Sequence, residues 1–332
     1  MTKNRSMQIQ SYGEIENLIM RELTLSKPGI GDVIVQNRFS GINFIDIYMR
    51  KGIYAKNRAY PTTLPLTLGM EGAGTVAETG PGVKNLKLND RVAYCLSPGS
   101  YAEYNIVPEW KLVKLPDFID FENAAALMLQ GSTAHYLTHT LFPLKKNQVC
   151  LIHAGAGGVG QLLIQLAKLR GAKVLTTVGS NKKGKIADEL GADVIIPYND
   201  IDFYEKVMDE TSGLGVDVVY ESVGKETIEQ SFQSLKTCGT CVLFGFSSGV
   251  VSSINPQEMA DAGSIFLTRP NLADYMSNSN IIRKRASDLF SYIKNNKLRI
   301  NIEKILPLVS ASEGQERLES RSSSGKLLLH LD

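Results

Sequence analysis

The sequence lacks several features, and each absence excludes a class of protein. No run of about 18 apolar residues occurs, so no membrane-spanning helix is predicted. The 332 residues include 36 basic and 34 acidic side chains, a formal charge of +2. Such a balance gives no reason to expect binding to nucleic acid or to an anionic membrane. We therefore expect a globular protein whose partner is a small molecule.

Cysteine is scarce as well. Cys95, Cys150, Cys238 and Cys241 all lie in apolar, strand-like segments. This placement predicts buried thiols in a reducing compartment, because a disulfide framework needs many cysteines in a short secreted chain. Residues 1–7 lack the apolar core of a signal peptide. A cytoplasmic location is expected.

The hydrophobic pattern changes near residue 125. Before it, short alternating stretches between glycine and proline turns predict a β-rich domain, with strands at 32–36, 72–77, 90–94 and 102–107. After it, strands alternate with helical patterns, as parallel βαβ units require. The predicted strands of this second part, enough for a doubly wound sheet, are 148–154, 173–178, 193–197, 216–220, 240–244 and 264–268.

The tail of the chain predicts an amphipathic helix at 282–295 and a final strand at 326–331, and we expect it to return to the first domain. The predicted fold is thus α/β. A β-rich domain covers 1–125 and is completed by 270–332, and a doubly wound parallel-sheet domain covers 126–269.

Residues 149–160, VCLIHAGAGGVG, predict a buried strand, a glycine turn and a helix. Gly155, Gly157 and Gly160 have the G-x-G-x-x-G spacing that permits a tight turn, close approach of a pyrophosphate, and close packing of helix on strand. The N–H groups and the dipole at the helix N-terminus favour the negative charge of that pyrophosphate. The segment predicts a dinucleotide site.

The next predicted strand ends at Val178 and indicates which nucleotide binds. An NAD site carries an acidic residue about 20 positions after the glycines, but residues 178–183, VGSNKK, contain no carboxylate. Ser180 can hydrogen-bond a 2′-phosphate, and Lys182 or Lys183 can neutralise it. We therefore expect NADPH. The alternative is that these lysines form only the solvated start of a helix.

Metal ligands are few and poorly spaced. Cys238 and Cys241 form a C-x-x-C pair without a second pair, and a closed zinc site needs four ligands. His135 and His139 are four residues apart but lack the carboxylate of an H-E-x-x-H motif. We expect packing or surface roles for all four residues, and no metal.

Seven motifs in order resemble the quinone oxidoreductase (zeta-crystallin-like) family of the zinc-independent medium-chain dehydrogenases/reductases. They are GINFIDIY at 41–48, LGMEGAG at 68–74, LQGSTA at 129–134, AGAGGVG at 154–160, ESVG at 221–224, FGFSSG at 244–249 and ESRSSSGK at 319–326. The resemblance covers nearly the whole chain. It implies a GroES-like catalytic domain, a Rossmann domain, and metal-independent, NADPH-dependent reduction of quinones or related conjugated carbonyls.

The same resemblance implies the site residues. Asn43, Tyr48 and Tyr54 would be catalytic and face the nicotinamide. The cofactor would also be bound by Gln130, Thr133, Gly155, Ala156, Gly157, Gly158, Val159, Gly179, Ser180, Lys183, Tyr198, Ser222, Val223, Phe244, Gly245, Phe246, Ser247, Phe266, Thr268 and Arg321. Relatives often carry a lysine where Gln130 stands. The zinc alcohol dehydrogenases of the superfamily carry a cysteine at the position of Asn43 and a histidine at that of Met70.

A hydrogen-bond donor near the acceptor oxygen would stabilise the negative charge that develops there, and Asn43, Tyr48 and Tyr54 are the candidates. A phenol can also supply the proton, but water can do so equally well.

Other readings of the whole chain remain open. One is a 2-enoyl thioester or alkenal reductase, and another is an NADPH-binding structural or RNA-associated, crystallin-like protein. The apolar strands 240–244 and 264–268 are expected at one edge of the sheet, where pairing with a second copy would give a homodimer.

Overall fold

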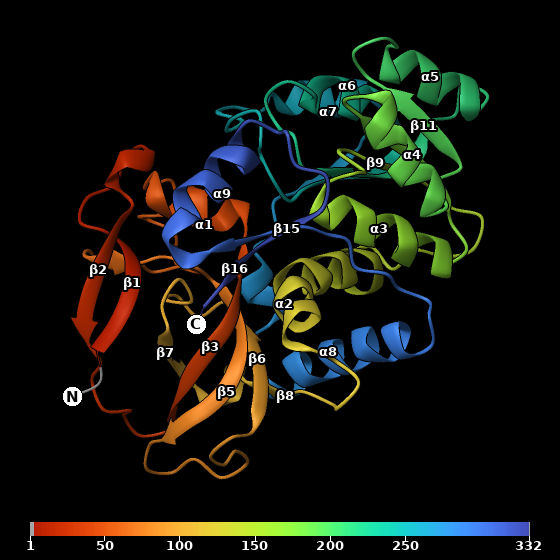
Figure 1. The fold of residues 1–332 in the computed structure, drawn as a ribbon. Helices are drawn as coiled ribbons and strands as arrows, with labels where there is room; N and C mark the ends of the chain where they lie inside the picture. The colour runs from red at the N-terminus through yellow and green to blue at the C-terminus, as the bar shows by residue number, and fades with distance from the viewer. Residues whose placement is uncertain (1–2, 332) are drawn as a thin grey trace. The chain divides into compact units, whose positions relative to one another are not determined.

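A computed structural model describes residues 3–331, which divide into two compact units (Figure 1). Unit 1 contains the chain up to Ser132 together with 273–295 and 300–332, and unit 2 contains 133–272 and 296–299. Met1, Thr2 and Asp332, which belong to the predicted first domain and tail, lie outside the described residues.

Unit 1 is built mainly of antiparallel strands. Its larger sheet has the order β15-β16-β3-β5-β6-β8, and β7 pairs with β3. A smaller sheet has the order β2-β1-β4. The strands are β1 (Lys3–Ile9), β2 (Ile19–Thr24), β3 (Asp32–Ile42), β4 (Leu66–Thr67), β5 (Glu71–Thr79), β6 (Arg91–Cys95), β7 (Tyr104–Pro108), β8 (Val113–Lys114), β15 (Ile302–Pro307) and β16 (Lys326–His330).

The register within this sheet explains its core. Alternate residues of β3 and β5, such as Val33, Val35 and Val76, point to one face and are fully buried with Val92 and Val107. The strand β16 runs antiparallel to β3, with Leu327 opposite Ile42. The end of the chain is thereby placed beside the segment that follows β3.

The helices of unit 1 include α1 (Phe44–Arg50), α8 (Ser279–Lys294) and α9 (Ala311–Glu319), and α2 (Phe121–Tyr136) begins in this unit. The helix α8 coincides closely with the amphipathic helix predicted at 282–295. Within residues 3–331, no helix is both long enough and apolar enough to cross a membrane.

Unit 2 contains a sheet of six parallel strands in the order β11-β10-β9-β12-β13-β14, which confirms the predicted doubly wound fold. Its strands are β9 (Val149–Ile152), β10 (Lys173–Val178), β11 (Val194–Pro197), β12 (Val216–Glu221), β13 (Leu235–Leu243) and β14 (Phe266–Thr268). Its helices are α3 (Gly158–Leu169), α4 (Asn181–Glu189), α5 (Phe203–Glu210), α6 (Ile228–Gln233) and α7 (Pro256–Asp261).

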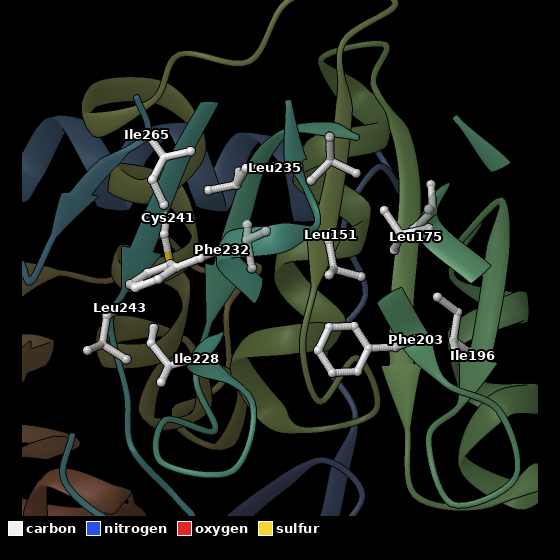
Figure 2. Close-up of a cluster of buried hydrophobic side chains, with 13 residues drawn as sticks. Leu151, Leu175, Ile196, Phe203, Ile228, Phe232, Leu235, Cys241, Leu243 and Ile265 are labelled. Carbon is white, nitrogen blue, oxygen red and sulfur yellow. The ribbon is translucent and has the colours of Figure 1, made fainter. Parts of the chain in front are cut away.

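The core of unit 2 lies between the sheet and its helices (Figure 2). The strands contribute Leu151, Leu175 and Cys241, and α5 and α6 contribute Phe203 and Phe232. Because a strand in a parallel sheet is covered on both faces, its residues are apolar almost without interruption. The strand β10, KVLTTV, has the predicted bounds 173–178, and five of its six residues are buried although two of them are threonines.

Two differences from the predictions concern β13. The strand β13 begins at Leu235 instead of 240, and its pairing with β12 shifts register before Thr240. Cys238 lies within this irregular part with φ of 58°, and its side chain is exposed. The predicted burial of Cys238 is therefore wrong, whereas Cys95, Cys150 and Cys241 are buried as predicted.

Candidate active site

The carboxyl edge of the parallel sheet gathers most of the predicted cofactor residues of unit 2. The strand order reverses between β9 and β12, and ligands of doubly wound folds bind outside the carboxyl ends of the strands at such a switch point. The residues that follow these strand ends are Gly155, Ala156, Gly157, Gly158 and Val159 after β9, Gly179, Ser180 and Lys183 after β10, Tyr198 after β11, Ser222 and Val223 after β12, and Phe244, Gly245, Phe246 and Ser247 after β13.

The turn after β9 needs its glycines for steric reasons. A Cβ atom on Gly155 would lie 2.0 Å from Thr176 Oγ1, and one on Gly160 would lie 2.3 Å from the carbonyl oxygen of Ala154. Gly157 is the N-cap of α3. The first N–H groups of a helix have no acceptor within the helix, so those of α3 are available to an anion. The predicted strand, turn and helix are confirmed.

The end of β10 offers groups that suit a phosphate. Ser180 is the N-cap of α4, and its hydroxyl oxygen accepts a hydrogen bond from Lys183 N over 3.3 Å. Tyr198 lies close to this turn, because a Cβ atom on Gly179 would come within 2.8 Å of the Tyr198 hydroxyl. An exposed serine, a lysine and an aromatic ring thus surround a turn without a carboxylate.

The loops after β12 and β13 are hydrogen-bonded to each other. Ser247 N donates to the carbonyl of Ser222 over 3.1 Å, and Ser248 N donates to that of Val223 over 2.8 Å. On the edge strand β14, Thr268 lies opposite Val242, near the carboxyl edge. Phe266 lies opposite Thr240, farther from that edge. Thr133, on α2, is buried within unit 2.

Unit 1 holds the remaining predicted residues, Asn43, Tyr48, Tyr54, Gln130 and Arg321. Asn43 is the N-cap of α1 and belongs to a buried polar cluster with Glu71 and Lys326. Lys326 Nζ lies 2.7 Å from Asn43 Oδ1 and 2.6 Å from Glu71 Oε2. Both members of the Lys326–Glu71 ion pair are almost completely buried, with side chains 1 % and 0 % exposed.

This cluster fixes the orientation of the Asn43 amide. Its oxygen accepts from Lys326 and, over 3.3 Å, from Gln130 Nε2. Its nitrogen donates to Glu71 Oε2 over 2.9 Å and to the Gly41 carbonyl over 3.2 Å. Because the ammonium group can only donate and the carboxylate can only accept, these partners determine which end of the amide is which. Both N–H groups of the amide therefore have acceptors within unit 1.

Asp46 lies in the first turn of α1. Its Oδ2 atom accepts from Asn43 N over 2.8 Å and from the Tyr101 hydroxyl over 3.0 Å. Its Oδ1 atom is buried and has no hydrogen-bond partner among residues 3–331. Burial raises the pKa of Asp46 to about 7, against the opposing effects of these hydrogen bonds and of Lys326. The carboxyl group thus titrates near neutral pH.

Three tyrosines of unit 1, Tyr48, Tyr54 and Tyr60, form an aromatic cluster. The ring centroids of Tyr48 and Tyr54 are 5.6 Å apart, and those of Tyr54 and Tyr60 are 5.2 Å apart. All three side chains are buried. Tyr60, which the sequence analysis did not single out, also accepts a hydrogen bond from Ala273 N over 3.4 Å. Arg321 is exposed and follows α9 with φ of 55°.

The described residues offer no grouped set of metal ligands. Among residues 3–331, no three His, Cys, Asp or Glu side chains are grouped so that they could hold a metal ion. The Lys326 ammonium lies against Asn43 and Glu71, and Met70 is buried. The rings of His135 and His139 stack with centroids 4.2 Å apart.

Sequence reasoning did not predict Asp46, Glu71 or Lys326 of unit 1 as site residues. It also missed His153 and Glu221 of unit 2, which are both hydrogen-bonded to Ser231. Asp46, Glu71, Glu221 and Lys326 each stand in one of the motifs, and His153 precedes the glycine turn, so each residue had a local signal. Lys326 stands 255 residues from its partner Glu71. Nothing in the local sequence indicates that pairing.

Comparisons with known proteins agree with this architecture. Residues 29–117 match the family model described as the alcohol dehydrogenase GroES-like domain, and residues 158–291 match the one described as zinc-binding dehydrogenase. The chain is 38% identical to a quinone oxidoreductase of Pseudomonas aeruginosa over 98% of this chain and 99% of that protein. It is 37% identical to a 2-haloacrylate reductase of a Burkholderia species, over 97% of each.

A solved structure is similar at the level of the backbone. The Escherichia coli quinone oxidoreductase complexed with NADPH matches with a TM-score of 0.94 at 37% identity, over 98% of this chain and 99% of that one. Together with the sequence similarity over nearly the full length, this match decides the family. The chain belongs to the quinone oxidoreductase family of the medium-chain dehydrogenases/reductases.

Proposed function

We propose that this protein is an NADPH-dependent quinone oxidoreductase, which reduces quinones or related conjugated carbonyls by hydride transfer. The observation that carries the proposal is the end of β10, where Ser180 caps α4 beside Lys183 and no carboxylate follows Val178. A carboxylate there would bind the ribose hydroxyl of NAD and repel a 2′-phosphate. The similarity to an NADPH-bound quinone oxidoreductase supports the choice.

The residues of unit 2 fit this cofactor. The N–H groups at the start of α3 would bind the pyrophosphate, and the Ser180–Lys183 turn with Tyr198 would bind the adenosine phosphate. The loops 222–223 and 244–247 would line the ribose and nicotinamide. When bound, NADPH supplies the hydride.

The task of unit 1 is to position the acceptor. Tyr48 and Tyr54 are the proposed hydrogen-bond donors to the acceptor oxygen, where negative charge develops during the reduction. Asn43 has a different role, since both of its amide N–H groups already donate to Glu71 and Gly41. It holds the start of α1, and thereby Tyr48, in place. The proton that completes the reduction comes from a tyrosine or from water.

A second candidate activity is reduction of an activated carbon–carbon double bond. The observation in its favour is the 37% identity to a 2-haloacrylate reductase over 97% of the chain. The fold and the cofactor would be the same, but the hydride would reach the β-carbon of the substrate.

A panel of acceptors tests the activity. Oxidation of NADPH is followed with 1,4-quinones, alkenones, 2-haloacrylates and enoyl-CoA, each with NADH as the control. We expect 1,4-quinones to give the highest kcat/KM with NADPH. A higher kcat/KM with 2-haloacrylate or enoyl-CoA would replace this activity with the second candidate, and no oxidation with any acceptor would refute both.

The cofactor assignment has its own test. Ser180→Asp adds a negative charge beside the expected phosphate, so we expect the NADPH Kd to rise by about a hundredfold, while the NADH Kd falls or stays unchanged. Lys183→Ala is expected to raise the NADPH Kd about tenfold. Lys185→Ala, an exposed position of the same helix, serves as the control. An unchanged NADPH Kd in both site variants would contradict the assignment.

The remaining proposals concern organisation. We propose a catalytic domain of 1–125 completed by 270–332, a nucleotide domain of 126–269, and a cytoplasmic homodimer. The edge strand β14 supports the dimer, because its Phe266 side chain is 61% exposed. A monomeric mass in sedimentation equilibrium would contradict the dimer.

A further inference from the structure

A chain of buried hydrogen bonds lies beneath the carboxyl edge of the sheet in unit 2. His153, which follows β9 and is 1% exposed, lies within this chain and is bonded to a neighbour on each side. His153 Nδ1 lies 3.0 Å from Thr177 Oγ1 of β10, and its Nε2 lies 2.9 Å from Ser231 Oγ of α6. Ser231 Oγ in turn donates to Glu221 Oε2 over 2.6 Å. Side chains from two strands, one helix and the residue that follows β9 are thereby joined.

Both ends of this chain bind the backbone of loops at the proposed cofactor site. At one end, Thr177 Oγ1 accepts from Ala154 N over 3.2 Å, within the glycine turn. At the other end, Glu221 Oε1 accepts from Val223 N over 2.7 Å and from Gly224 N over 3.0 Å. The chain therefore connects the turn expected to bind pyrophosphate with the loop expected beside the nicotinamide.

The direction of each hydrogen bond follows from the chemistry of the groups. A carboxylate only accepts, so Ser231 uses its hydrogen on Glu221 and must accept from His153 Nε2–H. Nδ1 of the neutral ring then accepts from the Thr177 hydroxyl, whose oxygen is left to accept the Ala154 N–H. Every donor has one acceptor, and only one tautomer of His153 satisfies them all.

The protonation state of His153 agrees with this pattern. Burial lowers the pKa of His153, although the charge of Glu221, whose Oε2 lies 3.4 Å from Nε2, opposes that effect. A neutral ring can accept on one nitrogen and donate on the other, as the chain requires.

We propose that the chain Thr177–His153–Ser231–Glu221 is a positioning device, which holds the glycine turn and the 222–224 loop in the relative positions that NADPH needs. This inference rests on the proposed function. None of the four side chains needs to touch the cofactor. A buried polar chain costs free energy wherever one member loses its partner, so it specifies a single arrangement of the loops more strictly than apolar packing does.

A double-mutant cycle on NADPH affinity tests whether the chain acts as one unit. Thr177→Val removes the link to the glycine turn, and Ser231→Ala removes the link to Glu221. We expect each to raise the NADPH Kd about tenfold, measured by isothermal titration calorimetry on the full chain, since about 1.4 kcal/mol corresponds to a factor of ten. The double variant should also show about a tenfold rise, because a chain that is already broken cannot be broken again.

Two further variants separate positioning from general stability. Ser234→Ala, at the C-cap of the same helix, removes a buried hydroxyl that donates only locally, to the Gln230 carbonyl over 2.7 Å. We expect Ser234→Ala to lower the Tm about as much as Thr177→Val or Ser231→Ala does, but to leave the NADPH Kd unchanged. His153→Gln can retain the Ser231 link without the Thr177 link, and we expect it to match Thr177→Val in Kd.

The outcomes are distinguishable. A wild-type protein that does not bind NADPH refutes the proposed function itself. If the wild type binds, a multiplicative effect of about a hundredfold in the double variant refutes the chain, and so does an unchanged Kd in both single variants. A lower Tm without a change in Kd also overturns the inference, because the chain would then be only structural. The KM for the acceptor should stay constant in all variants.

Discussion

Both units of this protein bury a glutamate completely, and they compensate its charge in different ways. In unit 1, Glu71 is paired with a buried cation, Lys326, and also accepts hydrogen bonds from Asn43 Nδ2, over 2.9 Å, and from Leu129 N. In unit 2, Glu221 accepts from two backbone N–H groups and from the hydroxyls of Thr227, over 2.9 Å, and Ser231, over 2.6 Å. Glu71 is therefore held by a full charge that stands 255 residues away in addition to two neutral donors, whereas Glu221 is held by neutral donors within ten residues.

This difference determines how much the free energy of unfolding falls when one partner of each glutamate is removed. Loss of one member of a buried ion pair leaves an uncompensated charge, which costs about 3 to 5 kcal/mol. Loss of one of several hydrogen bonds costs about 1 to 3 kcal/mol, because the remaining donors continue to stabilise the carboxylate. The ion pair thus secures the C-terminal strand β16 and the Asn43 amide together, whereas the dipoles secure two loops.

The largest effect is expected from Lys326→Met. The variant leaves Glu71 buried without its cation, so the free energy of unfolding should fall by about 3 to 5 kcal/mol, measured by urea denaturation. The matched control is Lys326→Met combined with Glu71→Gln, which removes both charges and should recover most of the loss. A loss below about 1 kcal/mol in the Lys326→Met variant would contradict the dependence of the buried Glu71 carboxylate on Lys326.

A smaller, pH-dependent effect is expected from Asp46→Asn. The folded protein holds the Asp46 proton up to a pKa of about 7, but the ordinary value is 3.8. Between these values the folded state binds more protons than the unfolded state, so this group's contribution to stability falls as pH rises through that window. Asparagine does not titrate. The difference in free energy of unfolding, Asp46→Asn minus wild type, should therefore increase by at most about 3 to 4 kcal/mol between pH 4 and pH 8.

Urea denaturation of both proteins at several pH values checks this prediction. Asp120→Asn, at an exposed carboxylate of the same unit, is the control for the general effect of removing a negative charge. If the difference between Asp46→Asn and wild type did not change with pH, Asp46 would titrate at its ordinary value.

The smallest effect on stability is expected from Glu221→Gln. Glutamine keeps one oxygen for the N–H groups of Val223 and Gly224, and the hydroxyls of Thr227 and Ser231 can rotate to accept from its amide. We expect a loss of about 1 to 2 kcal/mol in the free energy of unfolding. A loss as large as that of Lys326→Met would remove the contrast between the two clusters.

The sequence was sufficient for the elements whose signal is local. The segment 173–178, KVLTTV, predicted β10 with its observed bounds, and the glycine spacing predicted the turn that steric contacts at Gly155 and Gly160 require. The start of β13 was missed because a left-handed residue, Cys238, interrupts its pairing. The alternation of strands and helices in unit 2 follows from the hydrophobic pattern, but the irregular start of β13 does not.

The hydrogen-bond partners of Asn43 and His153 could not be predicted from the sequence, for a different reason. The Asn43 amide was predicted as a donor to the substrate, yet its partners come from positions 71, 130 and 326. Such contacts depend on how β3, β5 and β16 pair, which no local pattern specifies. Likewise, the sequence around His153 predicts only a core residue before the glycine turn. Its contact with Ser231 depends on how α6 packs, which the local sequence does not specify.

Side-by-side titration of the wild-type protein with NADPH and with NADH by isothermal titration calorimetry tests the central claim most directly. The arrangement of Ser180 and Lys183 after β10 predicts an NADPH Kd at least about tenfold lower than that for NADH. Equal affinities, or tighter binding of NADH, would contradict the account.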